Sequence, residues 1–481
     1  MTSDEVRKQY TPTIGIECHV QLSTKTKLFS AVGNDAREAP ANTLISHIDL
    51  GMPGALPVLN EAAVQLGIKA AFALGTPPQK FSKFDRKHYF YPDLPNGYQI
   101  TQFYDPIIRD GKVTFAYEGT EKTVRIHEAH LEADAGKSTH PTGKDYSLVD
   151  LNRAGTPLLE IVSEPDIHSP AEAKAYAREL QLLVRYAGVS DASLYYGNMR
   201  FDVNVSVSKT DKLGTRSETK NLNSFRSVEK AAQYEINRQI ERLEKGEKII
   251  QETRGWDDAK QKTFSQRSKE EAHDYRYMPD PDLPPIELAD DLIAAVEKTM
   301  PLMPNDYRAL FKDLGLDAAA IETLIDSPQN AAFVKAVYDQ HGADHAKRIA
   351  NWFVNIITAS EEDTGQAANK ADAGAAVKLS QMVTDRKLSS TAAKEIWIEL
   401  YNKGGDPEKI AADKNLLQVS NEGEIAKIVE QILADNPQAA TDVKNGEMKA
   451  IGFLVGQVMK ASRGKANPSM AQDLIKKQLG I

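Results

Sequence analysis

Thr-Ile-Gly-Ile-Glu-Cys-His-Val-Gln-Leu occupies residues 13–22, and the first half of the chain is organised around this stretch. Apolar and polar residues alternate along it, and this period of two predicts a β-strand with one buried face. Glu17 and His19 lie on the polar face, about two strand steps or roughly 7 Å apart. The strand alone leaves two interpretations open: the pair shares a metal ion, or the polar face meets water.

The chain has 481 residues, more than one hydrophobic core usually organises, which predicts two to four domains. Its net charge of −9 at pH 7 argues against a generally basic nucleic-acid-binding protein but does not exclude a local basic patch. The N-terminal residues are charged where a signal peptide would be apolar, and no apolar run reaches the length of a membrane span. These features predict a cytoplasmic protein that does not enter a membrane.

The chain contains a single cysteine, Cys18. One cysteine excludes a disulfide framework and a zinc site built from several thiolates, and it fits a reducing compartment. Cys18 lies on the apolar face of its strand, so we expect a small core residue rather than a nucleophile. No serine nucleophile motif stands out either, which argues against a self-contained hydrolase or glutaminase.

Strand and helix signals are unevenly distributed along the chain. From residue 13 to about residue 285, short strand-like runs are broken by Pro, Gly and Asn, with a few helices inserted. After Pro284-Pro285 the strand signals end and helical patterns dominate, and residues 404–407 form a second break. The sequence therefore predicts an α+β fold with three parts: a mainly β domain at 1–288, an all-α helical domain at 289–404 and a small α-helical tail domain at 405–481.

A second ligand-rich strand is predicted at residues 127–134, His-Glu-Ala-His-Leu-Glu-Ala-Asp, where His130 and Glu132 share a face. Its two histidines are three residues apart, whereas metalloproteases of the His-Glu-x-x-His type need them four apart on a helix. Residues 136–139 read Gly-Lys-Ser-Thr and resemble the end of a P-loop, but Leu131 stands where that motif requires its first glycine. A zincin and a P-loop nucleotide site are therefore not supported.

Two further strands present cations next to acids. Residues 199–207 form the clearest alternating strand, with Arg200 on its polar face. Residues 215–225 place Glu218 and Lys220 together on one face of another strand.

Residues 83–102 are dense in aromatic and polar groups. Arg86 and Lys87 are followed closely by Tyr89, Phe90 and Tyr91, which offers cations for the phosphates of a bound nucleotide and rings for stacking. A surface loop anchored by buried aromatic side chains explains the same pattern equally well.

These strands predict one site if they share a sheet. Carboxylates with an imidazole and no thiolate suit Mg²⁺ or Mn²⁺ better than a structural zinc. The candidate metal ligands are Glu17, His19, Glu132 and Glu218, and the cations free to meet phosphate are Lys87, Arg200 and Lys220. Such an arrangement is typical of phosphoryl transfer, in which cations neutralise a triphosphate while an acceptor oxygen attacks. The alternative is a polar surface crossed by salt bridges.

Near the C-terminus, residues 448–470 place Gly452 and Gly456 about one helical turn apart, followed by Lys460, Arg463 and Lys465. This pattern predicts either a contact with an RNA backbone or a closely packed helix whose lysines face water.

The motifs taken together closely resemble the B subunits of the bacterial aspartyl/glutamyl-tRNA amidotransferases. The resemblance runs in order through nearly the whole chain, and it is carried by Gly15–Leu22, Lys83–Asp93, Asp134–Ser138, Asp150–Asp166, Lys220–Phe225, Gln251–Arg254, Asp274–Asp282 and, in the tail, Gly452–Ala461.

This resemblance implies a ligase, one subunit of a glutamine-hydrolysing complex. ATP would phosphorylate the side-chain carboxylate of Glu-tRNA(Gln) or Asp-tRNA(Asn), and ammonia would then displace the phosphate to give the amide. The ammonia would come from glutamine hydrolysed on an amidase-type A subunit, with a small C subunit bracing the complex. The resemblance also implies a cradle-shaped catalytic domain and a tail that engages tRNA.

Carried over by motif, the resemblance makes Glu17, His19, Glu132 and Glu218 the expected Mg²⁺ site. It implies that Lys87 contacts phosphate or the ammonia path. Catalytic roles are expected for Glu17, His19, Lys87 and Glu132, and ATP binding for Arg86, Arg200 and Lys220.

The chain departs from the family pattern in two ways. Many relatives have an acid where this chain has Ala133, and some carry a cysteine zinc site that one cysteine cannot form. Two other functions compete with the ligase: a catalytically idle tRNA-binding scaffold subunit of the same complex, and a free-standing metal-dependent hydrolase.

Overall fold

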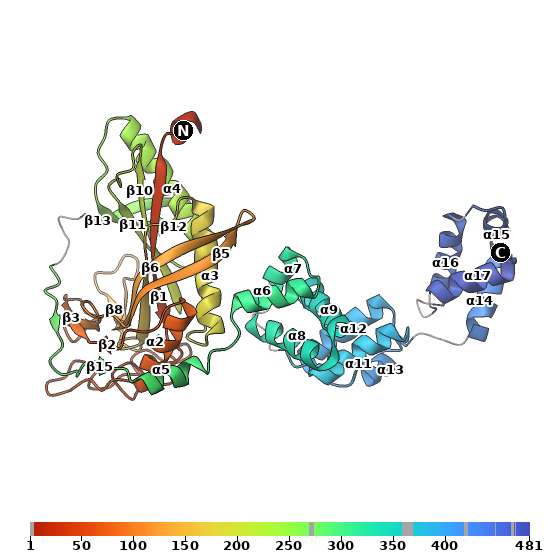
Figure 1. The fold of residues 1–481 in the computed structure, drawn as a ribbon, viewed down its shortest axis with the longest axis horizontal. Helices are drawn as coiled ribbons and strands as arrows, with labels where there is room; N and C mark the ends of the chain where they lie inside the picture. Colours follow the sequence, from red (N-terminus) through yellow and green to blue (C-terminus); the bar gives the residue numbers. More distant parts are fainter. Residues whose placement is uncertain are drawn as a thin grey trace. The chain divides into compact units, whose positions relative to one another are not determined.

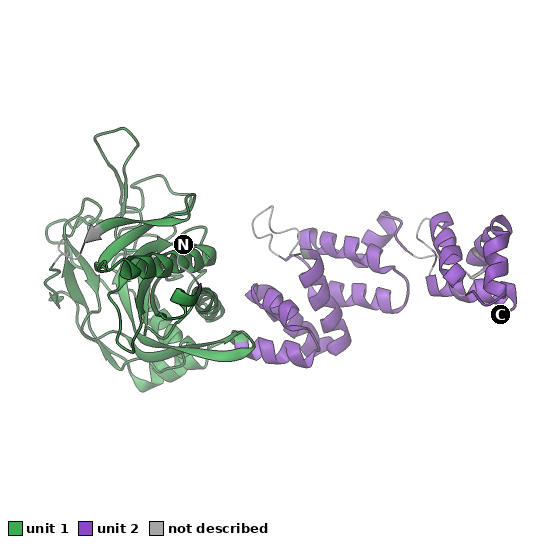
Figure 2. Cartoon of the chain, turned by 90° about the horizontal axis from the view of Figure 1, so that it is seen from above, with its two compact units in different colours: residues 1–304 green, residues 305–481 purple. Residues whose placement is uncertain are grey.

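The computed structural model describes residues 4–268, 274–357, 369–417, 422–447, 449–462, 466 and 468–481. Within them, packing divides the chain into two compact units, Met1–Pro304 and Asn305–Ile481, coloured separately in Figure 2. The first unit contains the strands and the second is helical, so the fold is mixed α+β as predicted. The three-part division at 288/289 and 404/405, and the cradle shape, stay predictions.

The first unit is built around β1 (Thr11–Gln21), the strand predicted from residues 13–22. In the described residues it lies inside an eight-stranded sheet of order β13-β12-β11-β10-β1-β9-β6-β5 (Figure 1). β1 pairs antiparallel with β10 on one side and with β9 on the other. The other strands of this sheet are β5 (Ile108–Tyr117), β6 (Thr120–Ala133), β9 (Pro157–Ser163), β10 (Met199–Ser208), β11 (Ser217–Leu222), β12 (Glu252–Asp257) and β13 (Lys262–Ser268).

The predicted alternation is confirmed in β1. Ile14, Ile16, Cys18 and Val20 are fully or almost fully buried in the hydrophobic core. Cys18 is therefore a core residue, as expected, and burial raises the pKa of its thiol well above the usual range.

Short strands and turns complete the β region. The hairpin of β5 and β6 turns at Glu118 and Gly119, which both adopt positive φ angles (50° and 76°) and so match the right-handed twist of the strands. The remaining described strands are β2 (Phe81–Ser82), β3 (Asp85–His88), β4 (Tyr98–Thr101), β7 (Lys137–Thr139), β8 (Leu148–Asp150), β14 (Met278–Pro279) and β15 (Ile286–Glu287).

Three long helices, α2 (Glu61–Ala73), α3 (Pro170–Tyr186) and α4 (Phe225–Glu244), cover the apolar side of the sheet. The side chains of Asn60, Ser169 and Ser224 cap their N-termini by accepting backbone hydrogen bonds. α3 also begins with Pro170, whose fixed φ suits the first helical turn. α1 (Asp4–Arg7) precedes β1. Because the helices bury one face of the sheet, the polar side chains of β1 lie on the opposite face.

α5 (Asp290–Glu297) belongs to the first unit. It packs against α2, and its Val296 is buried in the core of that unit. The packing of the first unit therefore continues past residue 288 to Pro304.

The second unit contains α6 (Pro304–Asp313), α7 (Ala318–Ile325), α8 (Pro328–His341), α9 (Ala343–Trp352), η2 (Phe353–Ile357), α11 (Ala373–Thr384), α12 (Ser390–Lys403), α13 (Pro407–Asp413), α14 (Glu422–Asp435), α15 (Pro437–Lys444), α16 (Lys449–Ala461) and α17 (Pro468–Leu479). The sequence pattern at residues 343–360 predicts a single helix. The π-helical turn η2 follows α9 directly, and residues 358–360 lie outside the described residues. None of the described helices combines the length and the apolar character that crossing a membrane requires.

Helices α14 to α17 share a hydrophobic cluster that includes Ile425, Val429, Leu454 and Ile475. On α16, the predicted glycine pair is exposed, and a Cβ added at Gly452 or Gly456 would meet no atom within 4 Å. α16 packs instead through Ile451, Leu454 and Val458, and Lys460 is exposed, which agrees with the alternative of a closely packed helix whose lysine faces water. Arg463 and Lys465, predicted with Lys460 to contact RNA, lie outside the described residues.

Candidate active site on the polar face of the sheet

The polar face of β1 carries a row of ionisable side chains from adjacent strands. His19 lies opposite Arg200 of β10 on one side and opposite Glu160 of β9 on the other, and Glu160 in turn lies opposite His130 of β6. Both imidazoles approach one carboxylate oxygen: His19 Nε2 is 3.3 Å and His130 Nε2 is 3.4 Å from Glu160 Oε2. Across the four strands the row therefore reads Arg200, His19, Glu160 and His130, with one carboxylate between two imidazoles.

Glu132, on β6 and buried, completes this group from the same face. Its carboxylate oxygens lie 3.9 Å from His19 Nε2 and 3.8 Å from His130 Nε2. Burial lowers the pKa of both imidazoles, but Glu160 and Glu132 outweigh it and raise the pKa of His19 to about 9 and that of His130 to about 10. In return, although burial opposes ionisation, the two histidines hold the pKa of Glu160 well below its usual range.

Lys87 lies beside this group on β3. Burial would lower the pKa of its ammonium group, but Glu132 outweighs it, so the pKa is raised and the group is a cation at neutral pH. Its Nζ is 5.0 Å from the centre of the Tyr275 ring, an arrangement that favours a cation.

A second group of acids surrounds Glu17, which lies two residues from His19 along β1. Glu17 lies opposite Asp202 of β10, and Asn204 Nδ2 donates to Glu17 Oε1 at 3.0 Å. Lys220 Nζ, on β11, contacts Asp202 Oδ2 at 3.0 Å and Glu218 Oε1 at 2.9 Å.

A bulge in β11 brings these residues together. The register of β10 and β11 shifts between Phe201 and Val203, so Asp202 faces the irregular segment. There Asn221 adopts a left-handed φ of 60°, which asparagine tolerates better than most residues, and its backbone N–H donates to Asp202 Oδ1 at 2.8 Å.

The charges of this second group are unbalanced. Burial, followed by repulsion from Glu160 and Glu218, raises the pKa of Glu17 to about 7, and Lys220 only partly offsets it. Burial acts against the charge of Lys220, but Asp202 and Glu218 raise its pKa. Near neutral pH, a further positive charge beside Glu17 would therefore stabilise its ionised form.

Each group has the donor geometry of a metal site. Among the described residues, one ligand atom from each member of His19, Glu132 and Glu160 lies within 4.8 Å of the others, and the same holds for Glu17, Asp202 and Glu218. The donors are carboxylate oxygens with one imidazole and no thiolate, a set that fits Mg²⁺ or Mn²⁺.

The four predicted metal ligands thus lie on one face but fall in two neighbouring groups, His19 with Glu132 and Glu17 with Glu218. Sequence reasoning left out the third member of each, Glu160 and Asp202. Both carried a usable signal, since Glu160 alternates with buried leucine and isoleucine in β9 and Asp202 lies on the polar face of β10. Their proximity to β1 depends on strand order, which alternation does not reveal.

The predicted phosphate-binding cations differ in their surroundings. Arg200 Nη2 lies 3.6 Å from Asp134 Oδ2, which also accepts from Arg153 Nε at 2.9 Å. Lys220 lies within the second acidic group, as described above.

Arg86 is held in place by two aspartates and an aromatic ring. Its Nε donates to Asp280 at 2.9 Å and its Nη2 to Asp282 at 2.7 Å, and its guanidinium lies over the Tyr98 ring at 4.2 Å. Nearby, Tyr89 packs edge-to-face with Tyr275, whereas Phe90 is 84% exposed. The aromatic segment therefore combines an anchor with an exposed ring.

Comparison with known proteins identifies the family. The family model of the GatB/GatE catalytic domain matches residues 12–294, which include both acidic groups, and the model of the GatB domain matches residues 332–479. The chain is similar over nearly its whole length to proteins named as the B subunit of aspartyl/glutamyl-tRNA(Asn/Gln) amidotransferase. That of Persephonella marina is 43% identical over 98% of this chain and 100% of the relative, and that of Nitrosococcus oceani is 44% identical over 98% and 100%. That of Thiobacillus denitrificans is 45% identical over 97% of this chain and 98% of the relative. This chain therefore belongs to the family of the B subunits of the aspartyl/glutamyl-tRNA(Asn/Gln) amidotransferases.

Proposed function

We propose that this chain is the subunit that activates and amidates the side-chain carboxylate of misacylated Glu-tRNA(Gln), Asp-tRNA(Asn) or both. In this reaction the carboxylate oxygen takes the γ-phosphoryl group of ATP and ADP leaves. Ammonia then attacks the carbonyl carbon, phosphate leaves, and the amide of Gln-tRNA(Gln) or Asn-tRNA(Asn) remains. The proposed enzyme is a ligase that acts in the cytoplasm, where its aminoacyl-tRNA product is used.

The observation that carries this proposal is the pair of neighbouring acidic groups on one sheet face. We assign one cation to His19, Glu132 and Glu160, and one to Glu17, Asp202 and Glu218. Mg²⁺ held by these residues would neutralise the triphosphate and the charge that develops during phosphoryl transfer. The raised pKa of Glu17 supports this assignment, because the protein alone leaves its carboxylate without enough positive charge.

Three cations of the chain complement the phosphates in this proposal. Lys87 stays protonated beside Glu132 and is placed to meet a phosphoryl oxygen or to line the path of ammonia. Arg200 and Lys220 border the two acidic groups, and each can exchange its present carboxylate contact for a phosphate. Arg86 was also expected to bind ATP; we now propose a role in holding the 280–282 segment.

The proposed partners follow from what this chain lacks as well as from its family. Its only cysteine is buried and has a raised pKa, so this chain offers no thiolate for glutamine hydrolysis. We propose that an amidase-type A subunit supplies ammonia from glutamine and that a small C subunit braces the complex. The tail helices α14 to α17 are proposed to engage tRNA. The free-standing hydrolase is not favoured, since the relatives are named as subunits of an amidotransferase, and the idle scaffold is not favoured, since residues 12–294 match the model of a catalytic domain.

Glu17→Gln tests this function in the assembled complex, supplied with ATP, Mg²⁺, misacylated tRNA and ammonium chloride in place of glutamine. We expect amide formation to fall at least about 100-fold, because the neutral amide cannot balance a cation. Glu121→Gln, at the exposed end of β6, is the matched control and should leave the rate unchanged. Undiminished amide formation by Glu17→Gln would favour the scaffold role, and turnover by this chain without ATP or tRNA would favour the hydrolase.

A further inference from the structure

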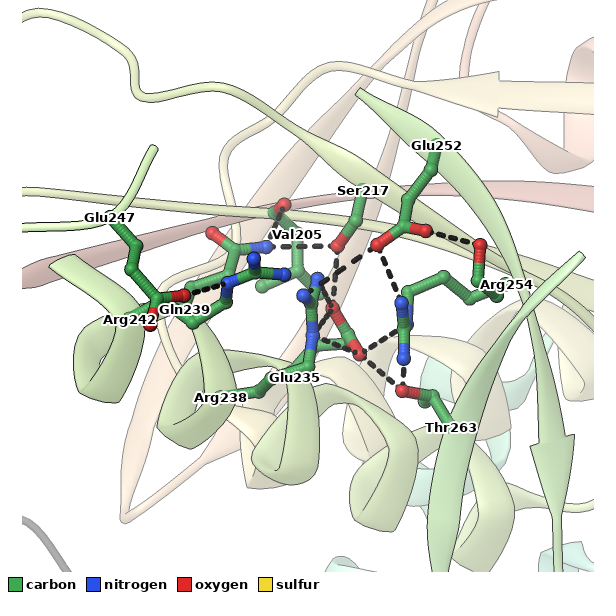
Figure 3. Close-up of polar contacts among 11 residues, drawn as sticks. Val205, Ser217, Glu235, Arg238, Gln239, Arg242, Glu247, Glu252, Arg254 and Thr263 are labelled. Carbon is green, nitrogen blue, oxygen red and sulfur yellow. Dashed lines mark hydrogen bonds and ion pairs between the residues drawn. The ribbon is translucent and has the colours of Figure 1, made fainter. Parts of the chain in front are cut away.

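The end of the sheet formed by β11, β12 and β13 is fastened to α4 by charged and polar groups in addition to apolar packing (Figure 3). Glu235 of α4 is fully buried, and its carboxylate accepts hydrogen bonds from Ser217 Oγ at 2.6 Å and Arg238 Nη2 at 2.7 Å. It also accepts from the hydroxyl of Thr263 and pairs with Arg254 Nε at 3.0 Å. One carboxylate thus connects α4 with β11, β12 and β13.

A second side chain of α4 adds to this connection. Gln239 Nε2 donates to Ser217 Oγ of β11 and to the carbonyl oxygen of Val205 in β10, both at 2.9 Å (Figure 3). Gln239 is fully buried, as is Ser217. Buried polar groups with several partners hold a single geometry, because each lost hydrogen bond leaves an unsatisfied group. The relative placement of β10, β11 and β12 is therefore fixed from the helix side.

The strand positions fixed by α4 also determine where side chains lie on the opposite face of the sheet, which carries the candidate site. Ser217 and Arg254 point toward α4, so their neighbours in sequence, Glu218 and Thr253, point to the site. β11 and β12 run parallel with Glu218 opposite Thr253. The hydroxyl of Thr253 donates to Glu218 Oε2 at 3.0 Å.

Both oxygens of Glu218 are therefore occupied, Oε2 by Thr253 and Oε1 by Lys220 at 2.9 Å. Lys220 also contacts Asp202, so it is shared within the acidic group. Thr253 is β-branched and half-buried, and its backbone is tied to the buried Arg254, so its hydroxyl has little freedom to turn away. A carboxylate held in this way keeps one orientation when it binds a cation.

We propose that Thr253 is a positioning residue for Glu218, and that the buried Glu235–Arg254 pair holds Thr253 in place. This inference rests on the proposed function, in which Glu218 is a ligand of a divalent cation. Thr253 touches neither substrate nor cation; it acts through the orientation of the Glu218 carboxylate.

The test is a titration of the purified full chain with Mn²⁺, followed by electron paramagnetic resonance, which counts bound ions and gives their dissociation constants. Thr253→Val keeps the shape of the side chain but removes the donor. We expect it to weaken Mn²⁺ binding at the site that contains Glu218 by about 10-fold or more. Thr253→Ser keeps the hydroxyl and should restore the affinity to within about twofold of the original. Thr123→Val, at an exposed position of β6, is the matched control and should change nothing.

A second variant and a second measurement distinguish the loss of a positioning role from a general loss of folded structure. Thr253→Ala also lacks the hydroxyl, so its Mn²⁺ affinity should equal that of Thr253→Val. The two variants differ in their methyl groups, so equal affinities would exclude an effect of methyl packing. In the assembled complex, both variants should need about 10-fold more Mg²⁺ for half-maximal amide formation while keeping the rate at saturating Mg²⁺. Unchanged Mn²⁺ affinity and Mg²⁺ requirement in both variants would overturn the inference, as would a failure of Thr253→Ser to restore them.

Glu218→Gln distinguishes failure of this inference from failure of the proposed function. The proposed function requires Glu218→Gln to abolish one Mn²⁺ site. If that site persists, both the metal assignment and the inference fail. If Glu218→Gln abolishes the site and Thr253→Val leaves it intact, only the positioning role of Thr253 fails.

Discussion

Glu160 is the residue on which the first acidic group is centred. Its Oε2 lies within 3.4 Å of Nε2 of both His19 and His130, and these imidazoles hold its pKa far below the usual range. Without Glu160, two imidazoles whose raised pKa values depend chiefly on this carboxylate would lose their main counter-charge. Glu160 therefore determines the protonation of the group as well as offering a ligand.

We expect Glu160→Gln to lower amide formation by the assembled complex at least about 100-fold, because it removes both a ligand oxygen and the charge between the histidines. The assay uses ammonium chloride as nitrogen donor, so that glutamine hydrolysis does not limit the rate. Glu164→Gln is a matched control, since Glu164 also pairs with a histidine, His127 Nδ1 at 3.0 Å, but lies partly exposed outside the group. Equal rates of amide formation for the two variants would show that Glu160 is not part of the active site.

Some site residues can be found from sequence and others cannot, for a physical reason. Alternation in a single strand shows which side chains share a face, and this was enough to select Glu17, His19, Glu132 and Glu218. It does not show which strands are neighbours or in what register they pair. Glu160 and Asp202 join their groups only through the pairing of β1 with β9 and β10, a contact between segments more than 140 residues apart. For the same reason, one predicted metal site became two neighbouring groups.

At the scale of elements, α4 and the strands β11, β12 and β13 that it supports show how a buried carboxylate stabilises the fold. Burial opposes ionisation of Glu235, but hydrogen bonds from Arg238, Ser217 and Thr263 lower its pKa below the ordinary value of 4.5. Arg238 of the same helix and Arg254 of β12 are the charged groups that face it, and Glu252 of β12 contacts both of them. The Glu235 carboxylate is therefore ionised near neutral pH and neutralised by two guanidinium groups.

This arrangement predicts a pH-dependent contribution to stability. A depressed folded-state pKa contributes stability that is fully present above the unfolded-state pKa of about 4.3 and is lost as the pH falls through the folded-state value. We expect Glu235→Gln to lower the free energy of unfolding at pH 7 by about 1.5–3 kcal/mol, because the buried Arg254 and the half-buried Arg238 lose a charged hydrogen-bond partner but keep their contacts with Glu252. The difference between the variant and the original chain should shrink as the pH is lowered below about 4. Urea unfolding at a series of pH values measures both effects.

Glu241→Gln provides the control on the same helix. Glu241 is exposed and pairs with Lys245 four residues further along, a surface ion pair of the kind that contributes little. It should leave the unfolding free energy nearly unchanged at every pH. A pH-independent loss for Glu235→Gln would mean that packing, and not charge, explains its effect.

At the scale of the whole molecule, the change from strand to helix signals predicted the α+β fold but not which helices share a core. A helix pattern shows that one face of a helix will be buried, but not against which element. α5 begins at Asp290, directly after the predicted boundary at residue 288, and so it was grouped with the helices that follow. Its Val296 instead lies in the core of the first unit, and Leu292 and Ile293 pack against that core.

This placement of α5 predicts the outcome of truncation. A chain that ends at residue 304 keeps α5, whereas one that ends at residue 288 loses it. Burial of one valine side chain stabilises a fold by about 1.5–3 kcal/mol, before the partly buried neighbours are counted. We therefore expect the melting temperature of 1–288 to lie about 5 °C or more below that of 1–304, measured by calorimetry under identical conditions. The complementary fragments supply the control: 289–481 and 305–481 should melt alike, because residues 289–304 pack in the first unit and add nothing to the second. Equal melting of the two N-terminal fragments, or a stabilising effect of residues 289–304 on the helical fragment, would instead support the boundary at residue 288.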